Sequence, residues 1–437
     1  MSSKIKTIIG TTSVLLLIII VWAVWTIKTE PKPKGTVPIT ELKFWGVYSS
    51  DTWANYWNGS ISRFEAQNPG VKILYSAPDF SKTSIHISRL DMAFKTNTAP
   101  DVCAGAIFML AIGAEKNWFE PLSQYIASWE DKRDIIDQAY EKGTYKGKIY
   151  GIGFDASSRL IVYRKDYFKE AGMDPERPPE TWEDLADCAF KLTKRDEYGV
   201  TRSGFNIPSD GLDLLVSFAR QNGGDFITQD SQPAFNTPEW VETLEYFRDM
   251  VVNKKVNIIT NRAENQANNL FLNGKATISQ LLADELRKLL NSHPSWREKI
   301  GIIDMKRKKP SVWAGCAYPF IMSNSRHKDL AWKFVQFILS PDEMWRRYKE
   351  TRCPVVRKSL MERYFEDDPF LNKAIWNGMR IGDGAAKVPW YDKMDKQIRR
   401  AMEESFHEGK PPAQALDQAM ERLLMEIDSS SKQKRIS

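Results

Sequence analysis

The sequence predicts an α/β protein with two domains, and three observations lead to that class. The chain has 437 residues, which is more than one ordinary hydrophobic core accommodates. Its composition is that of a globular protein, with 42% hydrophobic and 27% charged residues. After residue 36, short apolar strands alternate with amphipathic helices, and this order is typical of a parallel, doubly wound sheet.

The first 35 residues form a separate segment. Residues 7–27 carry no charge and are long enough to cross a bilayer as a helix. Trp22 and Trp25 stand where a signal-peptide cleavage site would have small residues. We therefore expect an uncleaved signal anchor, with cleavage and secretion as the alternative. Two prolines just after this span predict a stiff stalk.

The net charge of +6 comes from the two ends of the chain. Residues 1–35 hold five lysines and one glutamate, and residues 429–437 hold three basic residues. The body between them has 54 basic and 55 acidic residues and is nearly neutral. Nucleic-acid binding needs basic residues concentrated on one face, so we expect no nucleic-acid partner.

The four cysteines and four histidines form no metal-binding or redox motif, because no CxxC spacing or His cluster occurs. Cys188 lies in a helical apolar pattern and is explained as a buried thiol. A disulfide between Cys316 and Cys353 is conceivable in an oxidising compartment, and the sequence leaves this open.

The beginning of the body predicts alternating strands and helices. Residues 39–47 alternate as a strand, and a helix over residues 52–68 ends at an Asn-Pro-Gly breaker. Residues 71–75 form a second strand, residues 84–96 an amphipathic helix, and a third strand begins at residues 99–102. The ligand crevice of such a sheet lies at the carboxyl ends of its strands.

Residues 145–192 are the most informative stretch. They begin with two short strands around a tight turn and continue with a strongly apolar strand over residues 159–163. A helix closed by Gly172 follows. The next helix has Thr181 as its N-cap and Asp184 three residues later, which is the spacing of a capping box.

The rest of the chain predicts mostly helix. From there to residue 290 we expect helices, with an edge strand over residues 276–280. Residues 311–323 return as a strand, and residues 328–339 form an amphipathic helix. Helices continue to a polar tail after residue 428.

Several segments, in one order along the chain, resemble the extracellular solute-binding proteins of family 1, the maltose-binding-protein-like carbohydrate receptors of ABC importers. Each segment alone is only strand, turn or cap chemistry, but the joint order is specific and spans residues 40–425. The segments are FEAQNPGV (64–71), APDV (99–102), the stretch 145–192, NTPE (236–239), FLNGKA (271–276), KDLAWKF (328–334) and the closing helix 411–424.

By this likeness the chain forms two doubly wound α/β lobes that are joined by hinge crossings and close on a ligand. The chain would cross between the lobes near Asp155 and near Trp313. The resemblance implies a first lobe of residues 36–156 and 314–349, a second lobe of residues 157–313 and 350–428, and a polar tail of residues 429–437.

A sugar cleft needs flat aromatic faces and polar groups that hydrogen-bond hydroxyls. The resemblance implies that Asp155 accepts from the ligand beside Phe154, and that Trp313 stacks on it where Gly315 allows close approach. Asp284 stands where many relatives carry a tryptophan, which puts the stacking platform of the second lobe in doubt. The other residues expected at the ligand site are Trp45, Phe108, Ser157, Arg159, Arg352, Trp390 and Tyr391.

Structural explanations compete with these roles. Trp45 and Phe108 could pack in the core of the first lobe. Asp155 could stabilise a turn instead of binding a ligand.

The expected function is capture and not catalysis. The sequence has no nucleophile elbow, P-loop, GxGxxG after a strand or HExxH helix, so we predict no enzyme, no cofactor and no metal. A secreted glycosidase would need two carboxylates facing each other across a cleft, for which Asp155 and Asp284 are formally available.

We expect a monomer outside the cytoplasm that delivers a mono- or oligosaccharide to an ABC permease and is tethered to the membrane by residues 7–27. Two alternatives stay open. The same fold could bind a polyamine, phosphonate, thiamine or iron, or it could serve as a membrane-tethered sensor that reports its ligand to a neighbouring receptor.

Overall fold

The computed structural model describes residues 39–46, 50–77, 83–260 and 270–436. The segment expected to anchor the chain, residues 7–27, lies outside these ranges. Within them, none of the helices combines the length and the hydropathy that a bilayer crossing requires.

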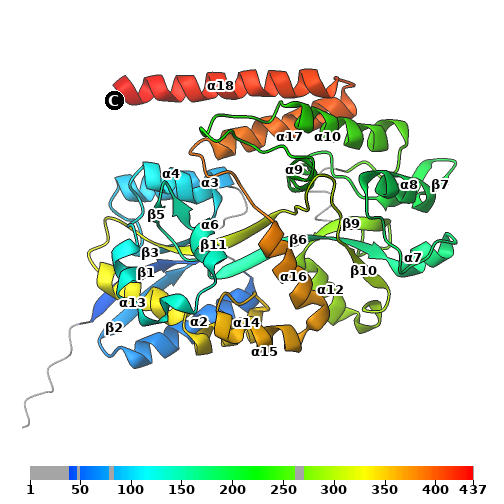
Figure 1. Ribbon diagram of the computed structural model, residues 1–437. Coiled ribbons are helices and arrows are strands. Elements are labelled where there is room, and N and C mark those ends of the chain that lie inside the picture. The colour runs from blue at the N-terminus through cyan, green and yellow to red at the C-terminus, as the bar shows by residue number, and fades with distance from the viewer. Residues whose placement is uncertain (1–38, 47–49, 78–82, 261–269, 437) are drawn as a thin grey trace, which may run out of the picture.

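One mixed sheet of nine strands runs through the described part of the molecule (Figure 1). The strand order is β2-β1-β3-β11-β6-β9-β8-β7, and β10 also pairs with β6. A separate small hairpin joins β4 and β5. The strands are β1 (Thr40–Trp45), β2 (Val71–Ser76), β3 (Val102–Ala106), β4 (Thr144–Tyr145), β5 (Lys148–Ile149), β6 (Asp155–Arg164), β7 (Lys194–Asp196), β8 (Gly199–Phe205), β9 (Ala276–Leu282), β10 (Ile300–Ile303) and β11 (Ala314–Ile321).

The first part of the sheet has the expected parallel, doubly wound order. β1 lies between β2 and β3 and runs parallel to both. Its buried side chains, Leu42 and Phe44, meet those of α2 and α13, so that Phe44 lies edge-on to Trp57 at 4.9 Å and to Phe334 at 5.2 Å. The helices before β6 are α2 (Asp51–Gln67), α3 (Thr83–Lys95), α4 (Phe108–Glu115), α5 (Ser123–Ala127) and α6 (Asp137–Lys142).

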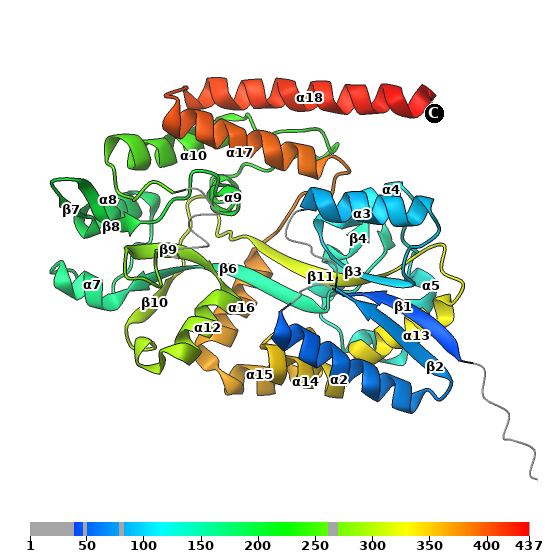
Figure 2. The ribbon, with the colours of Figure 1, turned by 180° about the vertical axis from the view of Figure 1, so that it is seen from behind.

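Two long strands cross the middle of the sheet and connect its two halves (Figure 2). β11 pairs antiparallel with β3, and its first four residues also pair antiparallel with the beginning of β6. The remainder of β6 pairs antiparallel with β9 and β10. Because β6 belongs to both halves, the chain passes from one to the other without leaving the sheet.

The second half of the sheet corrects two expectations. The strand over residues 276–280 was expected at an edge, but β9 lies between β6 and β8. The region after residue 192 was expected to be mostly helical, but it contains the hairpin of β7 and β8. The β7–β8 residues carry many charges and β7 is fully exposed, so their sequence lacks the apolar alternation on which strand prediction depends.

The capping box expected at the start of α8 is present. Thr181 Oγ1 accepts from the amide of Asp184 at 3.1 Å, and the Asp184 carboxylate accepts from the amide of Thr181 at 3.2 Å. Helices of this half and of the connections include α7 (Lys165–Glu170), α8 (Trp182–Leu192), α9 (Leu212–Gln221), α10 (Pro238–Arg248), α12 (Ala283–Ser292), α13 (Lys328–Ile338), α14 (Pro341–Thr351), α15 (Met361–Asp367), α16 (Pro369–Ile381), α17 (Tyr391–His407) and α18 (Pro412–Ile436).

The last two helices form an antiparallel pair on the outside of the second half. α18 packs on α17 and α10 and is the longest helix of the described chain. It continues to Ile436, although a polar tail was expected after residue 428. In Figures 1 and 2, the far end of α18 extends past the beginning of α17 and over α3 and α4 of the first half.

Candidate functional site

A cleft of about 800 Å³ opens where the first residues of β6 and β11 pair. Four groups of residues line it. The β6 side supplies Asp155, Ser157, Ser158 and Arg159, and the β11 side supplies Trp313, Gly315, Cys316 and Ala317. The end of β3 and the beginning of α4 supply Ala106, Ile107 and Phe108. The outer wall consists of Tyr391, Asp392, Lys393, Asp395, Lys396 and Arg399 of α17 with Glu426 of α18. Asp213, Leu282 and Ala385 complete the lining.

The floor of the cleft is the paired beginning of β6 and β11. Gly315 lies opposite Ser157, and Ala317 lies opposite Asp155. A Cβ added at Gly315 would meet no other atom within 4 Å. The missing side chain therefore leaves open space above the floor, where a ligand can approach the backbone.

Asp155 is held at the bottom of the cleft by a cysteine. The Cys353 thiol donates to Oδ1 of Asp155 at 2.9 Å, and both residues are buried. Burial, followed by the negative charge of Asp155, raises the pKa of Cys353 well above its ordinary value, so the sulfur keeps the proton that it donates. The cysteines of the described chain are free thiols, and Cys316 and Cys353 are not joined in a disulfide.

A buried arginine of α14 lies beside the hydrogen bond between Cys353 and Asp155. The Arg347 guanidinium is fully buried and donates to the carbonyl oxygens of Phe154 and, at 3.2 Å, of Ile338. Its Cζ atom also lies 5.1 Å from the ring centre of Phe154. The residues just before β6 are therefore tied both to α14 and to the segment that follows it.

The wall next to the floor carries a tight ion pair. Nη2 of Arg159 lies 2.5 Å from Oδ2 of Asp213 on α9, and each side chain is 14% exposed. The helix α9 also holds the backbone just before β11, because the amide of Trp313 donates to Oγ of Ser217 at 2.9 Å. Trp313 in turn accepts from the amide of Arg159 at 2.8 Å through its carbonyl oxygen.

The outer wall is made by the first turns of α17. Arg399 and Asp395 form a two-point pair, with N···O distances of 2.9 and 3.0 Å. Burial lowers the pKa of Arg399, but the hydrogen bonds to Asp395 outweigh it, so the pKa is raised. Asp392 accepts from the amide of Lys393 at the helix start, and burial raises its pKa.

Carboxylates slightly outnumber cations in this lining. Five acidic and four basic side chains line the cleft, which gives a formal charge of −1. Arg159 and Arg399 pair with carboxylates as described, and Lys396 lies 3.7 Å from Glu426. Among the described residues, no three His, Cys, Asp or Glu side chains are placed to hold a metal ion.

Seven of the twelve residues expected at the ligand site line this cleft. They come from the crossing strands, from the start of α4 and from the start of α17. They are Phe108, Asp155, Ser157, Arg159, Trp313, Gly315 and Tyr391.

Two expected aromatic residues pack elsewhere. Phe154 is fully buried, and its ring lies 6.1 Å from Trp57, because neighbouring residues at the start of a strand point to opposite faces. Trp45 ends β1, where it pairs with Ser76 and Cys103, and it packs partly buried against the core. Neither residue lines the cleft.

The other three also lie outside the lining. Asp284 starts α12, where burial and then the charge of Asp155 raise its pKa to about 7. Asp155 and Asp284 therefore do not both face the cleft, as a glycosidase pair would. Arg352 ends α14 in a left-handed conformation with φ 62° and pairs with Asp367 at 2.8 Å. Trp390 precedes α17 and is partly buried, whereas the next residue, Tyr391, faces the cleft.

Charged residues on α17, with Asp213 and Glu426, are the part of the site that sequence reasoning missed. The Asp395–Arg399 spacing is that of an ordinary exposed helical ion pair. The only signal in the sequence that would mark this pair is its proximity to Tyr391, because α17 and β6 line the same cleft but lie more than 200 residues apart in the chain.

Known proteins match this chain along most of its length. The family described as bacterial extracellular solute-binding protein matches residues 50–345. The sn-glycerol-3-phosphate-binding periplasmic protein UgpB of Escherichia coli K12 is 24% identical, over 90% of this chain and 94% of its own.

Solved structures share the fold. The sugar-binding protein MalE of Xanthomonas citri superimposes with a TM-score of 0.76 at 20% identity, over 90% of this chain and 100% of its own. A solute-binding protein of Thermotoga lettingae bound to α-D-tagatose gives 0.74 at 22% identity, over 88% and 98%. The Listeria monocytogenes protein Lmo0181, in complex with cycloalternan, gives 0.73 at 21% identity, over 89% and 99%.

Proposed function

Since the chain belongs to the bacterial extracellular solute-binding protein family, we propose that its cleft captures a neutral carbohydrate and delivers it to an ABC permease. Membership of the family places the body outside the cytoplasm and gives it the two-lobed α/β fold of a solute receptor. The identity of the solute, the boundaries of the lobes and the roles of individual residues are proposals.

The observation that carries the carbohydrate proposal is the chemistry of the cleft wall. Paired carboxylates and guanidinium groups offer fixed acceptors and donors side by side, as a ring of sugar hydroxyls requires. Trp313, Phe108 and Tyr391 add aromatic surface to the same lining, and such rings pack on the apolar face of a pyranose. The solved relatives bound to tagatose and cycloalternan support the same class of ligand.

The relative that binds sn-glycerol 3-phosphate raises the alternative of a phosphate ester. Three features of the cleft disfavour a dianion. The lining is formally negative, and Arg159 and Arg399 each already pair with a carboxylate. The start of α17, where an anion would gain from the helix dipole, is occupied by the Asp392 carboxylate.

The mechanism we propose is capture by closure. The ligand binds at the crossing of β6 and β11, and the two lobes then rotate about this crossing and bury it. The division into residues 36–156 with 314–349 and 157–313 with 350–428 is supported by α14 packing on α2 and by α17 and α18 packing on α9 and α10. No bond of the ligand is broken in this scheme, and no cofactor takes part.

A tether at residues 7–27 would keep the receptor near its permease and raise its effective concentration there. Import and sensing use the same closure, so a sensor role would rest on the same site. A single receptor chain would suffice for either role.

Ligand-dependent stabilisation tests the proposal. The melting temperature of the purified protein is measured with neutral mono- and oligosaccharides, with sn-glycerol 3-phosphate, and with a polyamine. A ligand that binds only the folded state raises the melting temperature, and more so at higher concentration. A rise with a neutral sugar, together with compaction in X-ray scattering, supports the proposal. A rise with only the phosphate ester or the polyamine would overturn the carbohydrate assignment.

A further inference from the structure

The helix α18 contributes one side chain to the cleft, from its second half. Its buried apolar face packs on α17 and α10 and includes Leu416, Ala419, Met420 and Leu423. One turn later, Glu426 lines the cleft. Figure 1 shows the helices α17 and α18 above the strands β6 and β11.

A chain of hydrogen bonds fixes the position of Glu426. Oε1 of Glu426 accepts from Nε2 of Gln397 at 2.7 Å, and Gln397 is buried. Oε1 of Gln397 accepts from Nε of Arg422 at 2.7 Å, and Arg422 also lies 3.5 Å from the buried Glu404. A carboxylate held in this way loses little conformational freedom when a ligand binds to it.

The same carboxylate remains accessible from the cleft. Its side chain is 34% exposed, and the neighbouring Lys396 is 71% exposed. Lys393, which lies three residues before Lys396 on α17, is held in place because its Nζ donates to the carbonyl oxygen of Glu426 at 2.9 Å. Asp155, in contrast, is buried at the floor of the cleft. The lining therefore has an inner and an outer polar end.

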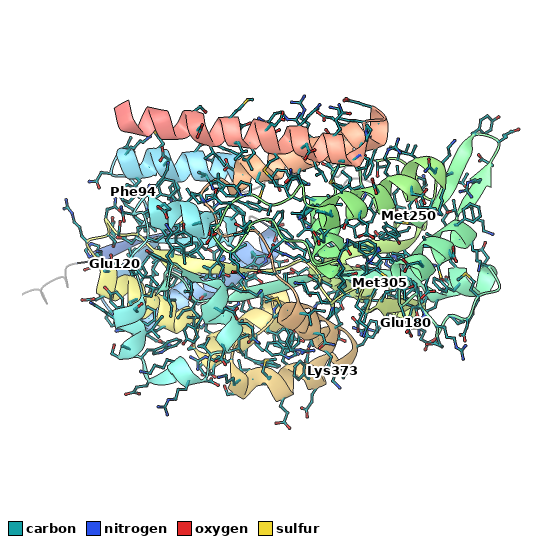
Figure 3. The ribbon with its side chains drawn as sticks, turned by 45° about the horizontal axis from the view of Figure 1, so that its top comes forward. Phe94, Glu120, Glu180, Met250, Met305 and Lys373 are labelled. Atoms are coloured by element: carbon teal, nitrogen blue, oxygen red, sulfur yellow. The ribbon has the colours of Figure 1, made fainter. Side chains whose placement is uncertain are left out.

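The views from above and from the side place the end of α18 toward the first half of the molecule. In Figure 3 it runs beside the helix that carries Phe94, which is α3. The ten residues after Glu426 extend the helix by about 15 Å. A ligand that projects from the floor toward solvent would pass this helix.

We propose that Glu426, presented by α18 with Lys393 and Lys396 of α17, is a specificity-determining residue that binds the outer sugar unit of an oligosaccharide. This inference rests on the proposed carbohydrate function and adds the ligand class to it. The cleft of about 800 Å³ is near the upper end of the range for small-molecule sites, so it accommodates more than one sugar ring. On this proposal, a monosaccharide binds at the floor and makes no contact with Glu426.

Isothermal titration of the full-length protein in detergent tests this role. The probes are glucose and tagatose as monosaccharides and mannotriose and maltotetraose as oligosaccharides. The variants are Glu426→Ala, Glu426→Gln and, as a matched control, Glu421→Gln, which changes an exposed carboxylate of the same helix that does not line the cleft. The melting temperature of each variant is recorded without ligand.

We expect wild type to bind an oligosaccharide, and Glu426→Ala to weaken that binding about ten- to hundredfold, as for the loss of a hydrogen bond to a charged group. The oligosaccharide affinity of Glu426→Gln should lie between those of wild type and Glu426→Ala. Glu421→Gln should bind the oligosaccharide like wild type. Monosaccharide binding should not change, whereas a merely structural loss would weaken both classes equally.

Four results would overturn the inference. An unchanged oligosaccharide affinity in Glu426→Ala would do so while the proposed function stands. Equal weakening of mono- and oligosaccharides, or wild-type binding of monosaccharides only, would do the same. If wild type binds no sugar at all, the proposed function fails and the inference fails with it.

Discussion

The thiol of Cys353 donates a 2.9 Å hydrogen bond to the carboxylate of Asp155, and this bond joins two segments that are 198 residues apart. The backbone next to Asp155 is held as well, because Arg347 donates to the carbonyl oxygen of Phe154 and the amide of Phe154 donates to Ala317 at 3.1 Å. Three passages of the chain therefore meet at the floor of the cleft.

The first prediction concerns that bond. Cys353→Ala removes the donor and leaves the buried Asp155 carboxylate short of a partner. We expect the free energy of unfolding to fall by about 1–3 kcal/mol and ligand affinity to fall with it. Cys353→Ser keeps a donor at the same position and should recover most of both losses. Chemical denaturation and calorimetric titration measure them, and equal losses in the two variants would contradict the assignment.

The second prediction concerns the open space at Gly315. Because a Cβ there meets nothing within 4 Å, Gly315→Leu should fold with little change in melting temperature but should fill the floor of the cleft. We expect ligand binding to be abolished, as measured by calorimetric titration.

Gly382→Ala is the contrasting variant, since its Cβ would lie 2.5 Å from the carbonyl oxygen of Gly378. It should lower the melting temperature clearly. Normal ligand affinity in Gly315→Leu would show that the ligand binds elsewhere.

The third prediction is a pH dependence from Asp284. Burial, and then the charge of Asp155, raises its folded-state pKa to about 7, above the ordinary value of 3.8. Below about pH 3 the group is protonated in both states. As the pH rises from 4 to 7 the unfolded state ionises first, so the folded state loses up to about 4 kcal/mol of relative stability.

Asp284→Asn removes this loss. The variant should unfold at a higher denaturant concentration than wild type at pH 8 and at a similar one at pH 4. Asp137→Asn, which changes a carboxylate that is 89% exposed, is the control and should follow wild type at both pH values. Parallel curves for wild type and Asp284→Asn from pH 4 to 8 would refute the assignment.

The fourth prediction separates structure from binding at Arg159 and Asp213. Arg159→Met alone leaves a poorly solvated carboxylate and should destabilise the protein by about 3 kcal/mol. The double variant with Asp213→Leu removes both charges and should regain most of that stability. Ligand affinity should stay low in both variants because the donors and acceptors of the wall are gone. Recovery of affinity in the double variant would mean that the pair is structural only.

Local features of the fold could be predicted from the sequence because they depend on neighbouring residues. The capping box of Thr181 and Asp184, and the helix closed by Gly172 at φ +72°, use groups a few residues apart. The strand pair β7–β8 and the internal place of β9 could not be predicted in this way. Strand position depends on which distant segment supplies the partner, and here β9 lies between β6 and β8.

The candidate site divides in the same way. Asp155, Ser157 and Arg159 were expected from the resemblance to the solute-binding family. The structure places all three in the cleft, because alternate residues at the start of one strand share a face. Phe154 was also expected there, but that alternation turns its ring into the core. Tyr391 of the outer wall was expected, but the charged residues of that wall, including Arg399 and Glu426, were not.

The sequence by itself determined the family, the alternation of β1, β2 and β3 with α2 and α3, and the capped helices α7 and α8. It also predicted the chain crossing near Asp155 as the centre of function. Only the tertiary structure decided which charges meet there. Short-range backbone preferences and caps are written in adjacent residues, whereas the pairing of Cys353 with Asp155 and of Arg159 with Asp213 depends on how distant segments pack. The packed chain alone fixes the donors and acceptors that a ligand would meet.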